Sequence, residues 1–388
     1  GFGGVLTRQQ WKGVVNFSHA VNAEIVTSFA TGVGTRDPSG VWTPAQAKQF
    51  LAYTKSVGGR IAAAEFMNEP TMAAMGGAPA GYDAAAYGRD FKVFFAFARE
   101  AAPKMLILGP GSVGETTGAW GIEYGNIPML KTRDMLIAAN SPVDAFSYHH
   151  YGASSIRCAG MGMGGTSADA ALSEEWLKRT DETLSFYRKL RDEFEPGKPI
   201  WLTETADAAC GGNPWGATFL DTFRYLDQLG RLAKQGVQVV IHNTLDASDY
   251  GLLDENTFEP KPNYWGALLW RQLMGTTVFE SGVPIQTGLH VYAHSLRGVP
   301  GGVALLVINT DRTATGTITL PIASERFTLS AMSSNLQDKH VQLNGQELKL
   351  GANDELPRLV GISTAAGEIS FAPGTITFLA MPKAMRSL

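Results

Sequence analysis

Two glutamates stand directly after short apolar runs, where each could act on a bound substrate. Glu69 follows the run Ile61–Phe66 within an Asn-Glu-Pro triplet, and Glu204 follows the run Ile200–Thr203. If both runs are parallel strands of an α/β barrel, these side chains lie at the carboxyl ends of the strands, where such barrels place catalysis. Two carboxylates that face each other are the groups that glycoside cleavage requires. The alternative for either glutamate is a helix-capping or solvated loop carboxylate.

A third glutamate and two histidines lie near the same predicted edge. Glu65 falls inside the run Ile61–Phe66. A lone buried charge is costly, so we expect Glu65 to have a partner and to act as a supporting residue. His149 and His150 end the run Asp144–His149. Neighbouring residues of a strand point to opposite faces, so one of the two histidines can enter the site.

The sequence contains no pattern typical of a metal or cofactor site. There is no HExxH motif, and Cys158 and Cys210 lack ligand spacing. The glycines near Gly211 and Gly212 do not fit a phosphate-binding fingerprint. We therefore expect neither metal nor cofactor. The backbone N–H groups of Gly211 and Gly212 could instead receive a substrate carboxylate.

Strand-like and helical segments alternate over residues 1–275. Six apolar runs have the length of strands: Ile25–Ala30, Ile61–Phe66, Met105–Leu108, Asp144–His149, Ile200–Thr203 and Val237–His242. Helical patterns lie between and around them: Arg8–Val21, a helix capped by Thr43 with Pro44 at its first position, Asp83–Ala101, Met129–Ala139, Ser173–Glu195, Phe219–Gln235 and Tyr264–Leu273. This alternation predicts parallel strands with helices outside, as in a TIM barrel. Residues 276–388 hold short β-rich runs separated by turn residues, which predicts a C-terminal antiparallel β-sandwich domain.

Composition excludes several other classes of protein. The 388 residues are 44% hydrophobic and include two cysteines, which excludes a disordered chain and a disulfide scaffold. No apolar run approaches the roughly 18–20 residues that cross a bilayer, so we expect no membrane partner. The net charge is −4 and there is no basic block, so we expect no nucleic-acid partner.

Taken together, the motifs resemble glycoside hydrolase family 79, the family of heparanase and its relatives. The resemblance covers nearly the whole chain and is strongest from His149 to Gly275. The stretches that carry it are Asn68-Glu69-Pro70, His149-His150-Tyr151, Trp201–Thr205 with Gly211-Gly212, Phe223–Gly230, Tyr250–Asn256, Pro262–Trp265 and Lys339–Leu348. It implies a (β/α)8 barrel with a β-sandwich domain and a retaining β-glucuronidase activity.

The resemblance also implies a role for each site residue. Glu69 would be the acid/base and Glu204 the nucleophile. The implied substrate-binding residues are Asn68 on the sugar 2-hydroxyl, Tyr250 with the backbone of Gly211 and Gly212 on the glucuronate carboxylate, Tyr151 on the nucleophile or the sugar, His149 as an orienting group, and Asn243 as a polar residue from the last barrel strand. Heparanases carry a lysine soon after their Asn-Glu-Pro, whereas Thr71–Ala78 contains no basic residue. Arg157 is the nearest candidate for a sulfate contact.

The leading interpretation is therefore a hydrolase that cleaves β-glucuronidic bonds in glucuronate-containing polysaccharides, with endo action on heparan sulfate. One alternative is an exo-β-glucuronidase, and another is a non-catalytic carbohydrate-binding barrel. Double displacement predicts carboxyl groups about 5–5.5 Å apart, against about 6.5–9.5 Å for inversion.

Two further expectations concern the completeness of the barrel and the cysteines. By resemblance the acid/base ends strand four and the nucleophile strand seven, but here they end the second and fifth visible strands. We therefore expect the chain to supply strands three to eight, and a separate N-terminal segment of about 40–80 residues to complete the barrel. Cys158 and Cys210 fall in loops after adjacent strands, which predicts a disulfide, with two free thiols as the alternative. A disulfide would favour a secreted or periplasmic protein.

Overall fold

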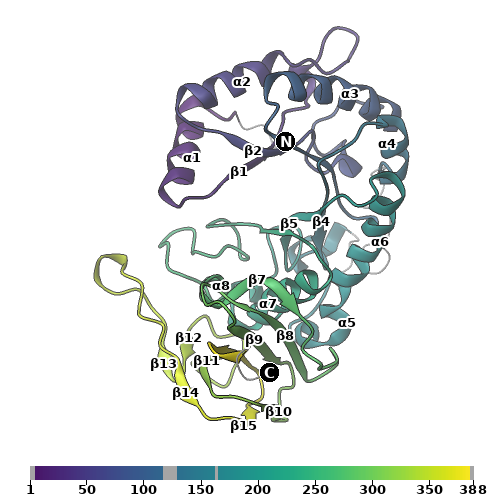
Figure 1. Cartoon of the computed structure of the whole chain (residues 1–388). Helices are drawn as coiled ribbons and strands as arrows, with labels where there is room; N and C mark the ends of the chain where they lie inside the picture. Colours follow the sequence, from purple (N-terminus) through teal and green to yellow (C-terminus); the bar gives the residue numbers. More distant parts are fainter. Residues whose placement is uncertain (1–4, 117–128, 162–164, 385–388) are drawn as a thin grey trace. The chain divides into compact units, whose positions relative to one another are not determined.

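The computed structural model describes residues 5–116, 129–161 and 165–384, and Figure 1 gives the order of their elements. Among them, six strands form one sheet in the order β1-β2-β3-β4-β5-β6. The strands are β1 (Ile25–Ser28), β2 (Ile61–Glu65), β3 (Leu106–Ser112), β4 (Ala145–Tyr151), β5 (Ile200–Ala206) and β6 (Val239–His242). The pairings from β1 through β4 are parallel. All six predicted strands are thus present in the predicted order.

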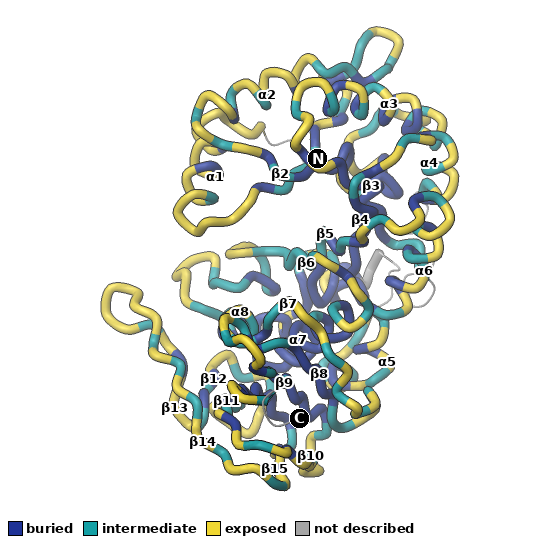
Figure 2. Tube along the Cα trace, in the orientation of Figure 1, coloured by how far each residue is buried: buried dark blue, intermediate teal, exposed yellow. Residues whose placement is uncertain are grey.

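Helices connect these strands, as the alternation predicts. They are α1 (Arg8–Ala20), α2 (Ala45–Ser56), α3 (Ala84–Ala101), α4 (Thr132–Ala139), α5 (Glu174–Leu177), α6 (Arg179–Phe194), α7 (Phe219–Lys234) and α8 (Pro262–Leu273). In Figure 2 the outward sides of α1 and α2 are mostly exposed, whereas the strands that they flank are more deeply buried. None of the described helices is long and apolar enough to cross a membrane.

The predicted cap of α2 is wrong in one detail. Pro44 itself occupies the N-cap position, and no side chain caps the helix. The Thr43 hydroxyl donates to the carbonyl of Thr35 instead. Thr43 therefore forms a hydrogen bond within the loop that precedes α2 and does not cap the helix.

The described residues divide into two compact units. The first comprises the described residues within Gly1–His150, Thr183–Glu204 and Gln238–Ile241, and the second comprises those within Tyr151–Glu182, Thr205–Val237 and His242–Leu388. The core of the first unit is rich in aromatic rings from α1, α2, α3 and the strands beside them. Its largest buried rings include Trp42, Phe66, Phe91 and Phe94. Burying such rings contributes a large share of the apolar driving force for folding this unit.

The core of the second unit packs α7 and α8 against antiparallel strands. These strands are β7 (Met274–Phe279), β8 (Leu289–Leu296), β9 (Val303–Asn309), β11 (Ser324–Ala331), β12 (Val341–Leu343), β13 (Gln346–Glu347), β14 (Ile362–Thr364) and β16 (Thr375–Met381). Among the described residues they form one sheet ordered β13-β12-β11-β16-β9-β8-β7, with β14 paired to β11. A separate ladder joins β10 (Gly316–Leu320) to β15 (Gly367–Phe371). The predicted antiparallel region is confirmed, while its description as a sandwich and its boundary at residue 275 stay predictions.

Candidate active site

Glu69 lies in a turn that holds its backbone in an unusual conformation. The turn follows β2 and leads into a short helical turn, Pro70–Met72. Glu69 has a φ of 47° and a ψ of 59°, in the left-handed region that a residue with a side chain rarely adopts. The hydroxyl of Thr71 anchors the turn, because it donates to the carbonyl of Val113 at 2.9 Å and accepts from the Val113 N–H. Strained backbone of this kind is found preferentially at functional sites.

Glu204 lies within β5 and not in the loop that follows it. Its side chain is 28% exposed, against 23% for Glu69, so both carboxylates are partly reachable by a ligand. The preceding residue, Thr203, donates its hydroxyl to a carboxylate oxygen of Glu65 at 2.7 Å. This bond ties the strand that carries Glu204 to the strand that leads to Glu69.

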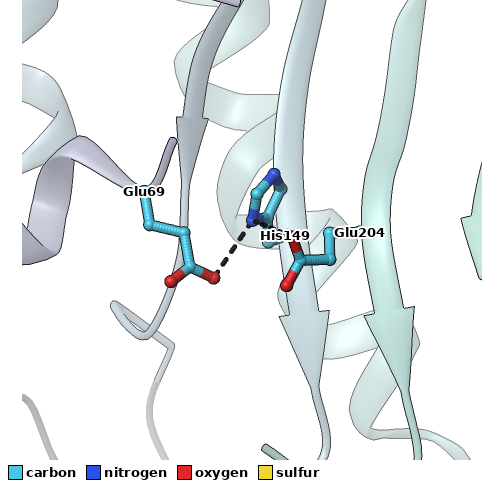
Figure 3. A group of neighbouring side chains, drawn as sticks. All are labelled: Glu69, His149 and Glu204. Carbon is cyan, nitrogen blue, oxygen red and sulfur yellow. Dashed lines mark hydrogen bonds and ion pairs between the residues drawn. The ribbon is translucent and has the colours of Figure 1, made fainter. Parts of the chain in front are cut away.

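His149 contacts three glutamates of the first unit: Glu65, Glu69 and Glu204. Its Nδ1 lies 3.1 Å from an oxygen of Glu69 and 3.8 Å from an oxygen of Glu204, and Figure 3 shows the ring between the two side chains. Its Nε2 lies 3.5 Å from an oxygen of Glu65. The predicted partner of Glu65 is therefore present, and it is an imidazole with a 1% exposed side chain.

The charges around His149 determine its protonation state. Burial alone would lower the pKa of His149, but its contacts with Glu65 and Glu69, together with the charge of Glu204, raise that pKa well above its ordinary value. Burial would likewise raise the pKa of Glu65, yet His149, Thr203 and Ser147 lower it. The result is an imidazolium beside the ionised carboxylate of Glu65 at neutral pH.

The two candidate catalytic carboxylates are close together. One oxygen of Glu69, one oxygen of Glu204 and a ring nitrogen of His149 all lie within 4.8 Å of one another. Such a trio could in principle bind a cation, because each group offers a ligand atom. The same two carboxylates are also the groups that acid–base and nucleophilic glycoside cleavage requires.

Three of the predicted binding residues are gathered within the second unit. The Asn243 amide donates to the Tyr151 hydroxyl at 2.8 Å and to the Tyr250 hydroxyl at 3.4 Å. The two tyrosine rings lie 6.4 Å apart and are largely buried. Within the first unit, Asn68 is exposed and directly precedes Glu69.

Arg157 joins two loops of the second unit. One guanidinium nitrogen donates to the carbonyls of Gly211 at 3.3 Å and Gly212 at 2.7 Å, and another pairs with the carboxylate of Asp249. Asp249 belongs to none of the sequence motifs, so its role as a partner of Arg157 is known only from this long-range contact. The predicted sulfate contact of Arg157 stays a prediction, since much of its hydrogen-bonding capacity is directed to protein atoms.

The predicted disulfide between Cys158 and Cys210 is confirmed. The two Cα atoms are 6.5 Å apart, within the usual range for a disulfide. The bond links the turn after β4 to the loop after β5. Strand order alone indicated this pairing, because loops that follow adjacent parallel strands lie at the same edge of a sheet.

A parallel sheet with intervening helices and a carboxylate near the ends of β2 and β5 is the arrangement found in α/β-barrel glycosidases. Comparison with solved structures supports the TIM-barrel fold class. The α-L-arabinofuranosidase of Thermotoga maritima superposes with a TM-score of 0.66 at 14% identity, covering 96% of this chain and 78% of that one. The GH51 arabinofuranosidase of Xanthomonas axonopodis pv. citri gives a TM-score of 0.63 at 15% identity, covering 96% of this chain and 78% of that one.

Residues 1–230 match the model of the N-terminal domain of glycosyl hydrolase family 79, and the chain belongs to this family. Among curated relatives, heparanase of Rattus norvegicus is 31% identical over 86% of this chain. Heparanase-like protein 1 of Arabidopsis thaliana is 26% identical over 98% of this chain. The chain spans 61% of the first relative and 75% of the second.

Proposed function

We propose that this protein is a retaining β-glucuronidase that cleaves glucuronate-containing polysaccharides, with endo action on heparan sulfate. Family membership makes it a glycoside hydrolase, and the names of its relatives supply the substrate class. Besides the heparanases, they include baicalin-beta-D-glucuronidase of Scutellaria baicalensis, at 29% identity over 56% of this chain and 44% of that protein, and hyaluronoglucuronidase of Hirudo nipponia, at 27% identity over 94% of this chain and 72% of that protein. Cleavage of a glucuronidic bond is common to these names.

The single observation that carries the mechanism is the short distance between the two carboxylates. An oxygen of Glu69 and an oxygen of Glu204 within 4.8 Å suit a nucleophile and an acid/base that share one anomeric centre. Inversion needs carboxyl groups about 6.5–9.5 Å apart to admit a water molecule. Glu204 attacks the anomeric carbon while Glu69 protonates the leaving oxygen, and Glu69 then activates the water that releases the sugar.

His149 assists this pair as a fixed positive charge. An imidazolium 3.8 Å from Glu204 stabilises the ionised nucleophile, and its bond to Glu69 fixes the side chain that must deliver a proton. Asn68 would hold the sugar 2-hydroxyl, where hydrogen bonds strengthen in the transition state.

Recognition of the glucuronate carboxylate is assigned to the second unit. Tyr250 and the backbone N–H groups of Gly211 and Gly212 are its proposed donors, and Asn243 orients the hydroxyls of Tyr250 and Tyr151. Support comes from the hydrogen bonds of Asn243 to both tyrosines.

Two alternatives have specific support. An exo-acting β-glucuronidase would use the same carboxylates and differ only in the loops around them. A carbohydrate-binding protein without catalysis is suggested by inactive heparanase-2 of Mus musculus, which is 26% identical over 95% of this chain and 63% of that protein. The pair Glu69 and Glu204, joined through His149, favours an enzyme.

A separate chain segment is proposed to complete the barrel beside β1. Among the described residues β1 pairs with β2 alone, so one of its edges carries free backbone donors and acceptors. A groove of about 440 Å³ runs along it, lined by residues such as Trp11, Phe29 and Phe50. On α1, Val14 and Phe17 are 41% and 51% exposed. A β-α-β segment would pair with this edge and cover these side chains. Mass spectrometry of the purified, denatured protein tests this idea, and a single 41.6 kDa species that is folded and active would refute it.

We place the protein outside the cytoplasm, secreted or periplasmic, because the Cys158–Cys210 disulfide persists most readily in an oxidising compartment. A polysaccharide substrate outside the cell suits this location.

The function is tested with an aryl β-glucuronide and proton NMR of the first-formed sugar. The proposal predicts release of the phenol, with β-glucuronate appearing before mutarotation. Absence of hydrolysis would leave the binding alternative, and initial α-glucuronate would refute retention. Size profiling of digested heparan sulfate then separates endo from exo action, since endo cleavage shortens the chains before monosaccharide accumulates.

A further inference from the structure

The loop after β5 has a backbone that its surroundings must impose. Cys210, Gly211 and Gly212 have φ values of 67°, 82° and 80°, so three consecutive residues adopt the left-handed region. Glycine enters this region readily, but a cysteine does so at a cost. A free loop of this sequence would populate many other conformations, so ordering it costs backbone entropy.

This backbone leaves two donors without a protein partner. Among the described residues, no acceptor bonds the N–H of Gly211 or of Gly212, although Gly212 is buried. Buried backbone donors are nearly always paired with protein, water or a ligand. Backbone N–H groups without a protein acceptor are suited to bind an anion.

Two links hold the loop in this conformation from the side of the β4 turn. The first is the Cys158–Cys210 disulfide. The second is Arg157, the neighbour of Cys158, which binds the carbonyls of Gly211 and Gly212 from behind. The carbonyl of Gly211 accepts from Arg157. In a trans peptide the C=O and the following N–H point in opposite directions, so the N–H of Gly212 points away from Arg157.

Gly212 is packed closely against Tyr250 and Asp207. A Cβ atom on Gly212 would lie 2.8 Å from the ring of Tyr250 and 2.9 Å from a carboxylate oxygen of Asp207. Asp249 also contacts the loop. Its N–H donates to the Gly211 carbonyl at 3.1 Å, and its carboxylate pairs with Arg157. The loop is therefore held by the disulfide, by the bonds of Arg157 and Asp249, and by close packing against Tyr250.

We infer that the Cys158–Cys210 disulfide and Arg157 are specificity determinants that pre-organise the N–H groups of Gly211 and Gly212 for the carboxylate of the substrate. This inference rests on the proposed β-glucuronidase function. Neither residue touches the reacting atoms, so both act as positioning residues. Their loss weakens the recognition of a charged sugar and leaves the chemistry of the two glutamates intact.

The test compares a charged with an uncharged substrate on two independent variants. Kinetics with 4-nitrophenyl β-D-glucuronide and 4-nitrophenyl β-D-glucoside are measured for the parent, for C158S/C210S and for R157K. Lysine keeps the charge but cannot bond both carbonyls and Asp249 with fixed geometry. D249N serves as a graded comparison, because it removes the charge that pairs with Arg157 but leaves the bonds of Arg157 to both glycine carbonyls.

The inference predicts a KM for the glucuronide that rises about fivefold or more in C158S/C210S and in R157K. The kcat on the glucuronide and the kcat/KM on the glucoside stay within about twofold of the parent, and D249N changes the glucuronide KM less than R157K. If a variant only lost stability, its thermal midpoint would fall while the glucuronide-to-glucoside preference stayed constant. An unchanged preference in both variants would overturn the inference while the proposed function stands. A parent without any preference for the glucuronide would instead overturn the proposed function itself.

Discussion

Replacing Glu65 by Gln is the perturbation that tests the charge arrangement of the site most sharply. Glu65 is buried, and its carboxylate lies 3.5 Å from Nε2 of His149. At an effective dielectric constant of about 20, two unit charges at that distance attract each other by about 5 kcal/mol. A glutamine keeps the shape and can still accept from Thr203, but it removes this attraction. Because the imidazole can shed its proton, we expect a smaller net loss, about 2–4 kcal/mol of the free energy of unfolding near pH 7.

The pH dependence of stability gives the more specific signature. His149 has a folded pKa raised well above its unfolded value, so its stabilisation is complete below the unfolded pKa and is lost as pH rises through the folded pKa. Within this window the free energy of unfolding falls by about 1.4 kcal/mol per pH unit for this one group. Glu65→Gln lowers the folded pKa of His149 and should narrow the pH window of this slope, although Glu69 and Glu204 still raise that pKa. We also expect kcat/KM to fall about 10- to 100-fold, because the ring that positions both catalytic carboxylates becomes neutral.

The assay is urea unfolding of the parent and the variant from pH 6 to pH 9. Glu24→Gln is the matched control, since Glu24 is an exposed carboxylate paired with the exposed Arg60 and should contribute less than about 1 kcal/mol. Parallel stability curves for the parent and Glu65→Gln across this range would refute the assignment of an imidazolium beside Glu65.

Three other variants probe separate parts of the account. Glu204→Gln should abolish turnover and leave the fold intact, and near-native activity would exclude Glu204 as the nucleophile. Gly212→Ala should raise the glucuronide KM about tenfold or more, because the added Cβ would lie 2.8 Å from Tyr250. Gly236→Ala is the control and should leave this KM unchanged, because Gly236 has a similar φ but nothing within 4 Å of an added Cβ. Burial raises the pKa of Asp207 to about 7, so the free energy of unfolding should fall as pH rises from about 4 to about 7, and Asp207→Asn should flatten that fall. Curves of equal slope for Asp207→Asn and the parent would contradict this pKa.

The strands that carry the candidate site were predictable because each begins with a short run of apolar residues. β2 and β5 contain buried residues that mark them clearly, and the glutamates near their ends follow from the geometry of parallel sheets. The end of β3 was not predictable. This strand continues through Gly109-Pro110-Gly111 to Ser112, although proline and glycine usually end strands. Gly111 lies against Glu65, where a Cβ atom would be 2.8 Å from the carboxyl carbon, so tertiary contact and not local preference fixes this segment.

Other features depended on contacts that local sequence does not encode. β8 includes the buried polar residues His290 and His294, which hide its apolar pattern. His290 is accommodated because its Nδ1 lies 2.6 Å from a carboxylate oxygen of Asp227 on α7. The bond from Thr203 to Glu65 is likewise a long-range pairing. Each of these residues reads as an ordinary polar side chain until its partner is known.

The central claim is that Glu204 is the nucleophile of a retaining glycosidase, and covalent trapping tests it most directly. A 2-deoxy-2-fluoro-β-glucuronide with a good leaving group should form a glycosyl–enzyme that hydrolyses slowly, because the fluorine destabilises the oxocarbenium-like transition state of both steps. The account predicts that mass spectrometry of the digested protein finds one sugar on the peptide containing Glu204, and that Glu204→Gln acquires none. A label on a different residue, or turnover of the aryl β-glucuronide without a trapped intermediate and with initial release of α-glucuronate, would contradict it.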